Sequence, residues 1–392
     1  MSVQGMMPNG QFFRLLGNRV AFVAVVSVLL FSRSSLAQAT SPGVAPQMSC
    51  GEACDPGGGG GGGGGTPPPN YNLNWGSPSE AGGVVIGGWP GREGPAVGEL
   101  SNLTYVAYTS PSDPVGDQYN DNYVYIRNLS GQFSRINSQT GFVSSDANPA
   151  LQLFSGYLYL AVNNSEFNPA RYNGGFTGLF RTGDGVTWNL SPGTQPGATS
   201  NFPYVDNSPS LTASSQYLFS GYRNAADYTL TICRTDPYGN SDCTNFPGSR
   251  AMNFNPSLAY LNGVLYIGYE EYDNAHALRM FTSTDNGQTI SENTNISNVN
   301  GDQTSTAPSL NVFRNTLYVG FRTNDSGQSF LYRYSTDGIN YSVRQGTGEQ
   351  MNGAPTLFSP TNPNNTYSGY MLNFYSSDDG HKYLTQNTAS HN

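Results

Sequence analysis

Four side chains that are able to bind or react with a polar ligand each stand at the end of a similar apolar segment. Arg223 follows "LFSGY", Glu270 follows "LYIGY" and Arg322 follows "LYVGF". Tyr375 ends the related segment "MLNFY". The corresponding positions of two further segments are Thr109 and Asn163. Because guanidinium groups match carboxylates and a carboxyl group can transfer protons, the set is a candidate ligand site. The alternative interpretation is that these groups are solvated or internally paired charges at strand ends.

The segments belong to a longer internal repeat that must position them. Each copy has a Pro, a small residue and an apolar residue, followed by a turn and the apolar segment. The six prolines, 47 to 60 residues apart, are Pro95, Pro149, Pro209, Pro256, Pro308 and Pro355. A second hairpin lies between successive copies, and four strands per repeat are typical of propeller blades. We therefore predict an all-β fold, a six-bladed β-propeller of four-stranded antiparallel blades, over residues 70–392.

The sixth repeat is too short to supply a fourth strand. The segment "YNLNW", residues 71–75, precedes the first repeat and has no partner there. We predict that this N-terminal strand of the domain pairs into the last blade and closes the ring, which hides both sheet edges. In such blades the loops from second to third strands and the blade-to-blade connections share one end. The six strand-end positions are therefore expected on one face, near the axis.

Three short turn motifs recur in the second hairpins: "TGDGVTW" (182–188), "STDNGQT" (283–289) and "STDGINY" (335–341). A calcium loop of the EF-hand kind needs further oxygen ligands at alternate positions and a distal Glu, and no copy supplies them. Asp and Asn accept hydrogen bonds from nearby backbone N–H groups, and Gly adopts positive φ without strain. Asp184, Asp285 and Asp337 are thus interpreted as structural turn residues.

These turns and the six repeats resemble the sialidase-like propellers, also called BNR or Asp-box repeat proteins, over residues ~70–392. In that family the Asp box joins the third strand to the fourth, on the side away from the substrate. Its enzymes clamp a sugar carboxylate with three Arg and use a Tyr nucleophile assisted by a Glu. The resemblance implies Glu270 and Tyr375 as catalytic candidates and Arg223 and Arg322 as substrate-binding residues. This chain departs from the family pattern because the first strand of its last blade contains no Tyr.

Three further residues are candidates for ligand binding. Arg92 lies three residues before Pro95, where the family carries an Arg two residues before a Pro, and it would be the third Arg. Tyr272 follows Glu270 closely, and an exposed Tyr face binds sugar rings through apolar contacts. Arg171 belongs to the long segment 163–176, which would overhang the site.

The first 69 residues have the composition of an export signal and a spacer. Arg14 and Arg19 precede the apolar run Val20–Phe31, and "AQA" at 37–39 offers a cleavage site. That run of 12 residues is shorter than the ~20 that a membrane helix needs. We predict a signal peptide over 1–39 and a disordered Gly/Pro-rich linker over 40–69. The mature chain would be secreted or extracytoplasmic and would have no membrane span. Whether the linker tethers it to the cell surface stays open.

Charge and cysteine content limit the kinds of binding partner and covalent link that the sequence predicts. The net charge is −9, and residues 1–39 contain no acidic residue, so nucleic acid is not an expected partner. Cys233 and Cys243 flank a hairpin turn that a disulfide could join, and Cys50 and Cys54 could pair with each other. The three His are scattered along the chain, so neither a metal site nor a cofactor is predicted.

Three functions are compatible with this sequence. The favoured one is a secreted, monomeric, carbohydrate-recognising propeller that binds an extracellular glycan or glycoconjugate at its axial face through loop-end Arg, Glu and Tyr residues. The first alternative is a glycoside hydrolase of the exo-sialidase type. The second is a non-catalytic protein-interaction propeller. Convergence of Arg92, Arg223 and Arg322 on one anion would favour an acidic sugar, and divergence would favour protein interaction.

Overall fold

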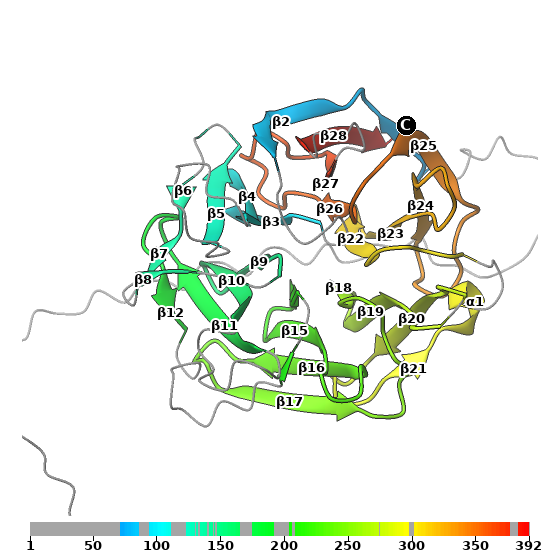
Figure 1. Ribbon diagram of the computed structural model, residues 1–392, viewed down its shortest axis with the longest axis horizontal. Coiled ribbons are helices and arrows are strands. Elements are labelled where there is room, and N and C mark those ends of the chain that lie inside the picture. Colours follow the sequence, from blue (N-terminus) through cyan, green and yellow to red (C-terminus); the bar gives the residue numbers. More distant parts are fainter. Residues whose placement is uncertain are drawn as a thin grey trace, which may run out of the picture. The chain divides into compact units, whose positions relative to one another are not determined.

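A computed structural model describes residues 71–85, 94–110, 123–129, 131, 134–138, 141–143, 145, 147–164, 175–191, 204–205, 208–273, 275–297, 302–376 and 383–391. In this part of the chain, six antiparallel sheets stand around a central axis and form the predicted all-β, six-bladed propeller (Figure 1). The expected signal peptide and linker lie outside the described residues.

The first three blades follow the chain from the inner strand outward. Blade one contains β3 (Ala96–Leu100), β4 (Leu103–Ser110), β5 (Tyr123–Asn128) and β6 (Ser134–Arg135). It is followed by a small hairpin of β7 (Asn137–Ser138) and β8 (Gly141–Phe142). Blade two contains β9 (Ala150–Phe154), β10 (Tyr157–Asn164), β11 (Gly175–Thr182) and β12 (Asn189–Leu190), with β13 (Tyr204–Val205) also paired to β11. Blade three contains β14 (Ser210–Ala213), β15 (Leu218–Arg223), β16 (Leu230–Thr235) and β17 (Ser241–Phe246).

The other three blades complete the ring. Blade four contains β18 (Ser257–Leu261), β19 (Val264–Glu270), β20 (Leu278–Ser283) and β21 (Ser291–Glu292). It is followed by the four-residue helix α1 (Thr294–Ser297), and the described chain has no helix long and apolar enough to cross a membrane. Blade five contains β22 (Ser309–Phe313), β23 (Thr316–Arg322), β24 (Ser329–Ser335) and β25 (Gln345–Gln350). Blade six contains β26 (Thr356–Phe358), β27 (Met371–Ser376) and β28 (Tyr383–His391), with β1 (Leu73–Trp75) and β2 (Ser79–Val85) both paired to β28.

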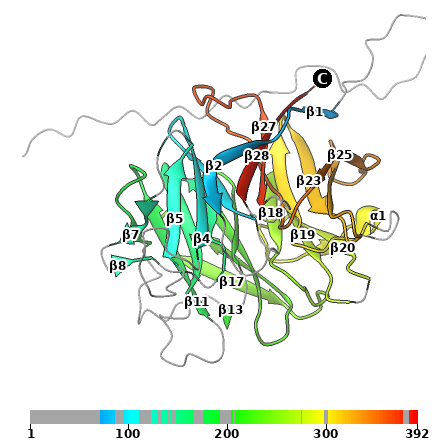
Figure 2. The same cartoon turned by 45° about the horizontal axis from the view of Figure 1, so that its top comes forward.

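The N-terminal strand closes the ring, as predicted. β1 pairs antiparallel with the end of β28, Leu73 opposite His391 and Trp75 opposite Ala389, and Figure 2 shows the two side by side. Tyr332 of blade five binds the same strand, because its hydroxyl accepts a hydrogen bond of 3.0 Å from the Leu73 amide. The last blade thus takes its outer strand from the start of the domain, and no partner is needed to cover that edge.

The second strand of each blade reads as a continuous apolar run because neighbouring blades cover both of its faces. Its glycine has a packing role in blades three to five. A Cβ on Gly221, Gly268 or Gly320 would approach a leucine of the next blade's first strand at 3.1, 2.7 and 2.9 Å. These leucines are Leu258, Leu310 and Leu357. The "GY" and "GF" pairs of the repeat are therefore set by blade-to-blade contact.

Serine side chains link neighbouring inner strands around the axis. The Ser257 hydroxyl accepts a 2.9 Å hydrogen bond from the Leu310 amide, and the Ser309 hydroxyl accepts one of 2.8 Å from the Leu357 amide. The Thr356 hydroxyl donates to the Pro95 carbonyl at 2.7 Å and so joins blade six to blade one. The six inner strands surround a cavity of about 300 Å³. Its wall includes Glu99, which is buried and accepts hydrogen bonds from the Thr361 amide and hydroxyl.

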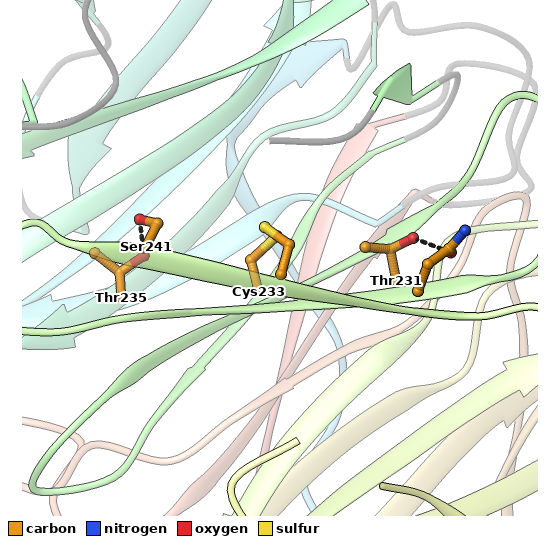
Figure 3. The surroundings of a disulfide bond; sticks show 6 residues. Thr231, Cys233, Thr235 and Ser241 are labelled. Atoms are coloured by element: carbon orange, nitrogen blue, oxygen red, sulfur yellow. Dashed lines mark hydrogen bonds between the residues drawn. A yellow bond between two sulfur atoms is a disulfide. The ribbon is translucent and has the colours of Figure 1, made fainter. Parts of the chain in front are cut away.

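A disulfide joins β16 and β17, as the spacing of Cys233 and Cys243 indicated. The two cysteines are directly opposite each other across the strands. Two further cross-strand pairs lie beside the bridge (Figure 3): the Thr231 hydroxyl donates to Asn245 Oδ1 at 2.7 Å, and the Thr235 and Ser241 hydroxyls lie 2.8 Å apart. Because residues two apart share one face of a strand, the bridge and both hydrogen bonds stabilise the same outer edge of blade three.

Candidate functional site

The Asp turns lie at one end of the blades, between third and fourth strands. Asp285 Oδ1 accepts hydrogen bonds from the Gln288 and Thr289 amides at 3.0 and 2.9 Å, and Asp337 makes the equivalent bonds in blade five. These contacts lower the pKa of Asp285 to about 2, with the largest effect from the Thr289 hydroxyl. The glycines after these Asp have φ near +80°, and a Cβ on Gly185 or Gly338 would collide with a Tyr hydroxyl of the preceding blade. These contacts fit a role in the fold.

At the opposite end, a paired arrangement recurs in blades three, four and five. The loop after the second strand holds a non-glycine residue with positive φ: Tyr228 (59°), His276 (50°) and Gln328 (46°). The carbonyl of each accepts a hydrogen bond of 2.8 to 3.1 Å from the chain entering the next blade. The side chain of each contacts the residue that ends its own second strand. All three loops make the same backbone hydrogen bond, and this accounts for their positive φ. The side chains differ from blade to blade, so they are what could give one blade a function that the others lack.

Arg322 uses its guanidinium group inside the protein. Nη1 donates to the carbonyls of Met351 and Asn352 at 3.1 and 2.6 Å and to Gln328 Oε1 at 3.2 Å. Nε donates to the Ser305 hydroxyl at 2.9 Å, and only 8% of the residue is exposed. Arg322 therefore joins blade five to the connection that leads to blade six.

Arg223 occupies the equivalent place in blade three and makes the corresponding contact. Its Nη1 donates to the carbonyl of Asn253, in the connection to blade four. The guanidinium carbon lies 4.3 Å from the centre of the Tyr228 ring, within the range of a cation–π contact. Arg223 is partly exposed, so the ring and the cation together form part of the surface.

Glu270 of blade four is completely buried and bonded to polar neighbours. Its Oε1 accepts a hydrogen bond of 3.0 Å from Asn253 Nδ2 and also contacts His276 Nδ1. The imidazole of His276 is about one-third exposed, so this residue connects a buried carboxylate to solvent. Such a pair could exchange a proton with a bound ligand.

Two tyrosines complete a continuous surface over blades three and four. Tyr272 is 62% exposed and Tyr228 is 40% exposed, and their ring centres lie 6.0 Å apart with a tilt of 48°. Asn253 connects this aromatic pair to the polar group, since its backbone accepts from Arg223 and its side chain donates to Glu270. We call this surface the Tyr228–His276 site. Its members are Arg223, Tyr228, Asn253, Glu270, Tyr272 and His276.

Tyr375 lies on blade six and bonds to a different carboxylate. It is 3% exposed, and its hydroxyl donates to Glu349 Oε2 at 3.1 Å; the same oxygen accepts from Asn387 Nδ2. Burial raises the pKa of the Tyr375 phenol, and the Glu349 charge raises it further. The phenol therefore stays protonated near neutral pH, and it could act as a nucleophile only if a base such as Glu349 took its proton.

The other predicted positions divide into two groups. Thr109 and Asn163 lie in blades one and two and bond to loops: the Thr109 hydroxyl donates to the Ala147 carbonyl at 2.9 Å, and the Asn163 amide donates to Ser145 Oγ at 3.1 Å. Arg92 and Arg171 lie outside the described residues. The structure thus brings Arg223, Glu270 and Tyr272 into one surface and places Arg322 and Tyr375 in separate contacts. Among the described residues, no group of three His, Cys, Asp or Glu side chains could hold a metal ion.

Tyr228, Asn253 and His276 were missed by the sequence reasoning. A signal for two of them was present, because Tyr228 lies five residues after Arg223 and His276 six after Glu270, as Gln328 does after Arg322. Asn253 had a weaker signal in the "MN" pair shared by residues 252–253 and 351–352.

No protein-family model matches the chain, and no curated protein does. A solved protein of unknown function from Dyadobacter fermentans is similar over 82% of this chain and 100% of its own, with a TM-score of 0.56 and 10% identity. A Trypanosoma rangeli sialidase is similar over 76% of this chain and 53% of its own, with a TM-score of 0.49 and 11% identity. A subtype N10 neuraminidase-like protein of A/little yellow-shouldered bat/Guatemala/060/2010 is similar over 81% of this chain and 99% of its own, with a TM-score of 0.48 and 6% identity. The first similarity shows a shared propeller fold and assigns the chain to no family.

Proposed function

We propose that this protein is an exported carbohydrate-binding propeller whose ligand occupies the Tyr228–His276 site. One observation carries the proposal: two exposed tyrosines in mutual contact lie beside a connected group of Arg, Asn, Glu and His side chains. Contact between an exposed aromatic ring and water is unfavourable, and the apolar face of a sugar ring would cover both tyrosines. The polar group beside them offers donors and acceptors for sugar hydroxyls.

The roles within the site follow from exposure. Tyr272 is the more exposed ring and would stack against a sugar ring, while Tyr228 is held in place by the Arg223 guanidinium beneath it. His276 and Asn253 reach solvent in part and would bond to hydroxyl groups. Glu270 is fully buried and would orient both of these side chains through hydrogen bonds.

Export remains a proposal that the disulfide supports. A bridge between Cys233 and Cys243 is stable in an oxidising compartment and rare in the cytosol. Together with the predicted signal peptide, it fits a protein that meets glycans outside the cytoplasm.

The test is binding of the full chain to a printed array of bacterial, plant and animal glycans, with two variants. Tyr272→Ala removes the most exposed ring of the site. Tyr238→Ala is the matched control, because Tyr238 is 84% exposed and lies in the turn between β16 and β17 at the other end of blade three. We expect wild type and Tyr238→Ala to bind the same glycans and Tyr272→Ala to lose them. Absence of binding by wild type, or equal binding by Tyr272→Ala, would refute the proposal.

The same preparations test hydrolysis, which the contact between Glu270 and His276 makes worth measuring. Fluorogenic sialosides and neutral glycosides are incubated with wild type and with Glu270→Gln. Release of fluorophore by wild type and not by Glu270→Gln would make the site catalytic. Binding without release would leave a recognition propeller.

A further inference from the structure

We infer that the ligand of the Tyr228–His276 site is a neutral saccharide and that the site disfavours sialic acids and uronates. The inference rests on the proposed function and concerns the charge of the ligand. It runs against the expectation that the arginines of this face clamp a carboxylate. Its basis is how the arginines on this side of blades three to five are bonded and where the exposed acidic residues lie.

Arg322, the substrate-binding candidate of blade five, is bonded within the protein. The guanidinium of Arg322 donates four hydrogen bonds to neutral acceptors of blades five and six, two of which are backbone carbonyls. A bidentate contact with a carboxylate needs a fork of two guanidinium N–H groups facing outward. With 8% of Arg322 exposed, the residue would have to break contacts between blades to offer that fork.

Arg223, the arginine inside the site, contacts other parts of the protein. Arg223 donates to the Asn253 carbonyl and lies against the face of Tyr228. These contacts use the guanidinium to support the aromatic ring and the Asn253 side chain. A ligand that drew Arg223 toward its own carboxylate would remove the support of the ring on which the sugar would lie.

Among the described residues, the other charged groups near the site are ion-paired or negative. Glu271 is bonded to Arg250 and Arg279 at 2.8 and 2.5 Å, and Glu292 lies 4.0 and 3.4 Å from the same two arginines, so two cations face two carboxylates. Asp227 and Asp273 are exposed and adjoin Tyr228 and Tyr272 in the chain. An anionic ligand would approach this acidic rim against repulsion, whereas a neutral sugar would not.

The Tyr228–His276 site offers the apolar and hydrogen-bonding contacts that a neutral sugar makes. Its apolar C–H face would cover Tyr272, where burial of about 60 Å² at 25 cal/mol/Å² corresponds to about tenfold in affinity. Its hydroxyls would bond to His276 and Asn253, which are both partly exposed.

The experiment compares neutral glycans with their sialylated or uronate-bearing counterparts on one printed array, using the full chain at 50 and 500 mM NaCl. We expect signals from neutral glycans, a change of less than twofold between the two salt concentrations, and signals at least tenfold lower for the acidic counterparts. The double variant Asp227→Asn/Asp273→Asn neutralises the rim, and asparagine retains the side-chain oxygen that accepts from the Thr229 and Ala275 amides. It should raise acidic-glycan signals about twofold to threefold and leave neutral ones unchanged.

Each outcome separates this inference from the proposed function. Stronger binding of acidic glycans that depends on Tyr272 and weakens in high salt would overturn the inference and leave a carbohydrate-binding site. Failure of the wild-type protein to bind any glycan would overturn the proposed function and the inference with it. An unchanged acidic-glycan signal from the rim variant, beside strong neutral binding, would refute the role of the rim.

Discussion

Replacement of Arg322 by Met tests whether this arginine stabilises the fold or binds ligand. Methionine retains a long apolar stem and removes the guanidinium. The buried carbonyl of Met351 then loses a charged donor, and so does the carbonyl of Asn352. A buried polar group without its partner costs about 1–3 kcal/mol, and Gln328 and Ser305 can turn to water at little cost. The expected loss in the free energy of unfolding is therefore about 3 kcal/mol, or about 150-fold in the unfolding equilibrium.

Urea unfolding followed by tryptophan fluorescence measures this loss. With a slope of about 3 kcal/mol/M, the midpoint should fall by about 1 M urea. Arg344→Met is the matched control, because 52% of the Arg344 side chain is exposed and its Nε lies 3.5 Å from Asp302 Oδ1. Asp302 is buried, but it keeps its hydrogen bonds from Arg333 Nε and Nη2 when Arg344 is replaced, so the loss should stay below about 1 kcal/mol. If Arg322→Met unfolds at the wild-type urea concentration and has lost glycan binding, the guanidinium serves a ligand and our interpretation of its contacts is wrong.

Three further predictions concern stability. Hydrogen bonds hold the pKa of Asp285 and Asp337 at about 2, although partial burial of Asp337 opposes its shift. Since the pKa of an unfolded Asp is about 3.9, these hydrogen bonds contribute to stability above about pH 4, and the contribution is lost as the pH falls toward 2. Thermal unfolding at pH 7, 4 and 2.5 should show this loss, and Asp285→Asn/Asp337→Asn should reduce the difference; an identical pH profile would contradict it. The Cys233→Ser/Cys243→Ser double variant should lose about 2–3 kcal/mol of unfolding free energy, measured in urea, because the bridge closes a hairpin with a sequence separation of 10; no effect of reductant on the wild-type midpoint would refute this. Glu99→Gln should lose about 2–3 kcal/mol by thermal unfolding, since Thr361 and Asn365 then face an amide in place of a carboxylate at 2.8 to 2.9 Å; a wild-type melting temperature would show that the carboxylate is dispensable.

The sequence by itself determined the architecture. The Pro–small–apolar pattern recurs with each blade, and its period follows from a local unit of four strands that every blade repeats. Closure by residues 71–75 was also predictable, because a blade with too few strands leaves an unpaired edge that another strand of the chain must cover. The ends of the second strands could likewise be located, since strand length and turn residues are local properties.

The tertiary structure alone decided what the residues at those ends do. Arg322 and Arg223 stand at equivalent positions, and both bond to the connection entering the next blade, about 30 residues further along the chain. Glu270 meets His276, whereas Tyr375 meets Glu349 and not Glu270. These partners lie in loops and outer strands whose side chains differ from blade to blade, so the repeat can locate some of their positions but does not report which contacts form. Their pairing is set by how adjacent blades pack, and that packing determines whether a charged group faces a ligand or another part of the protein.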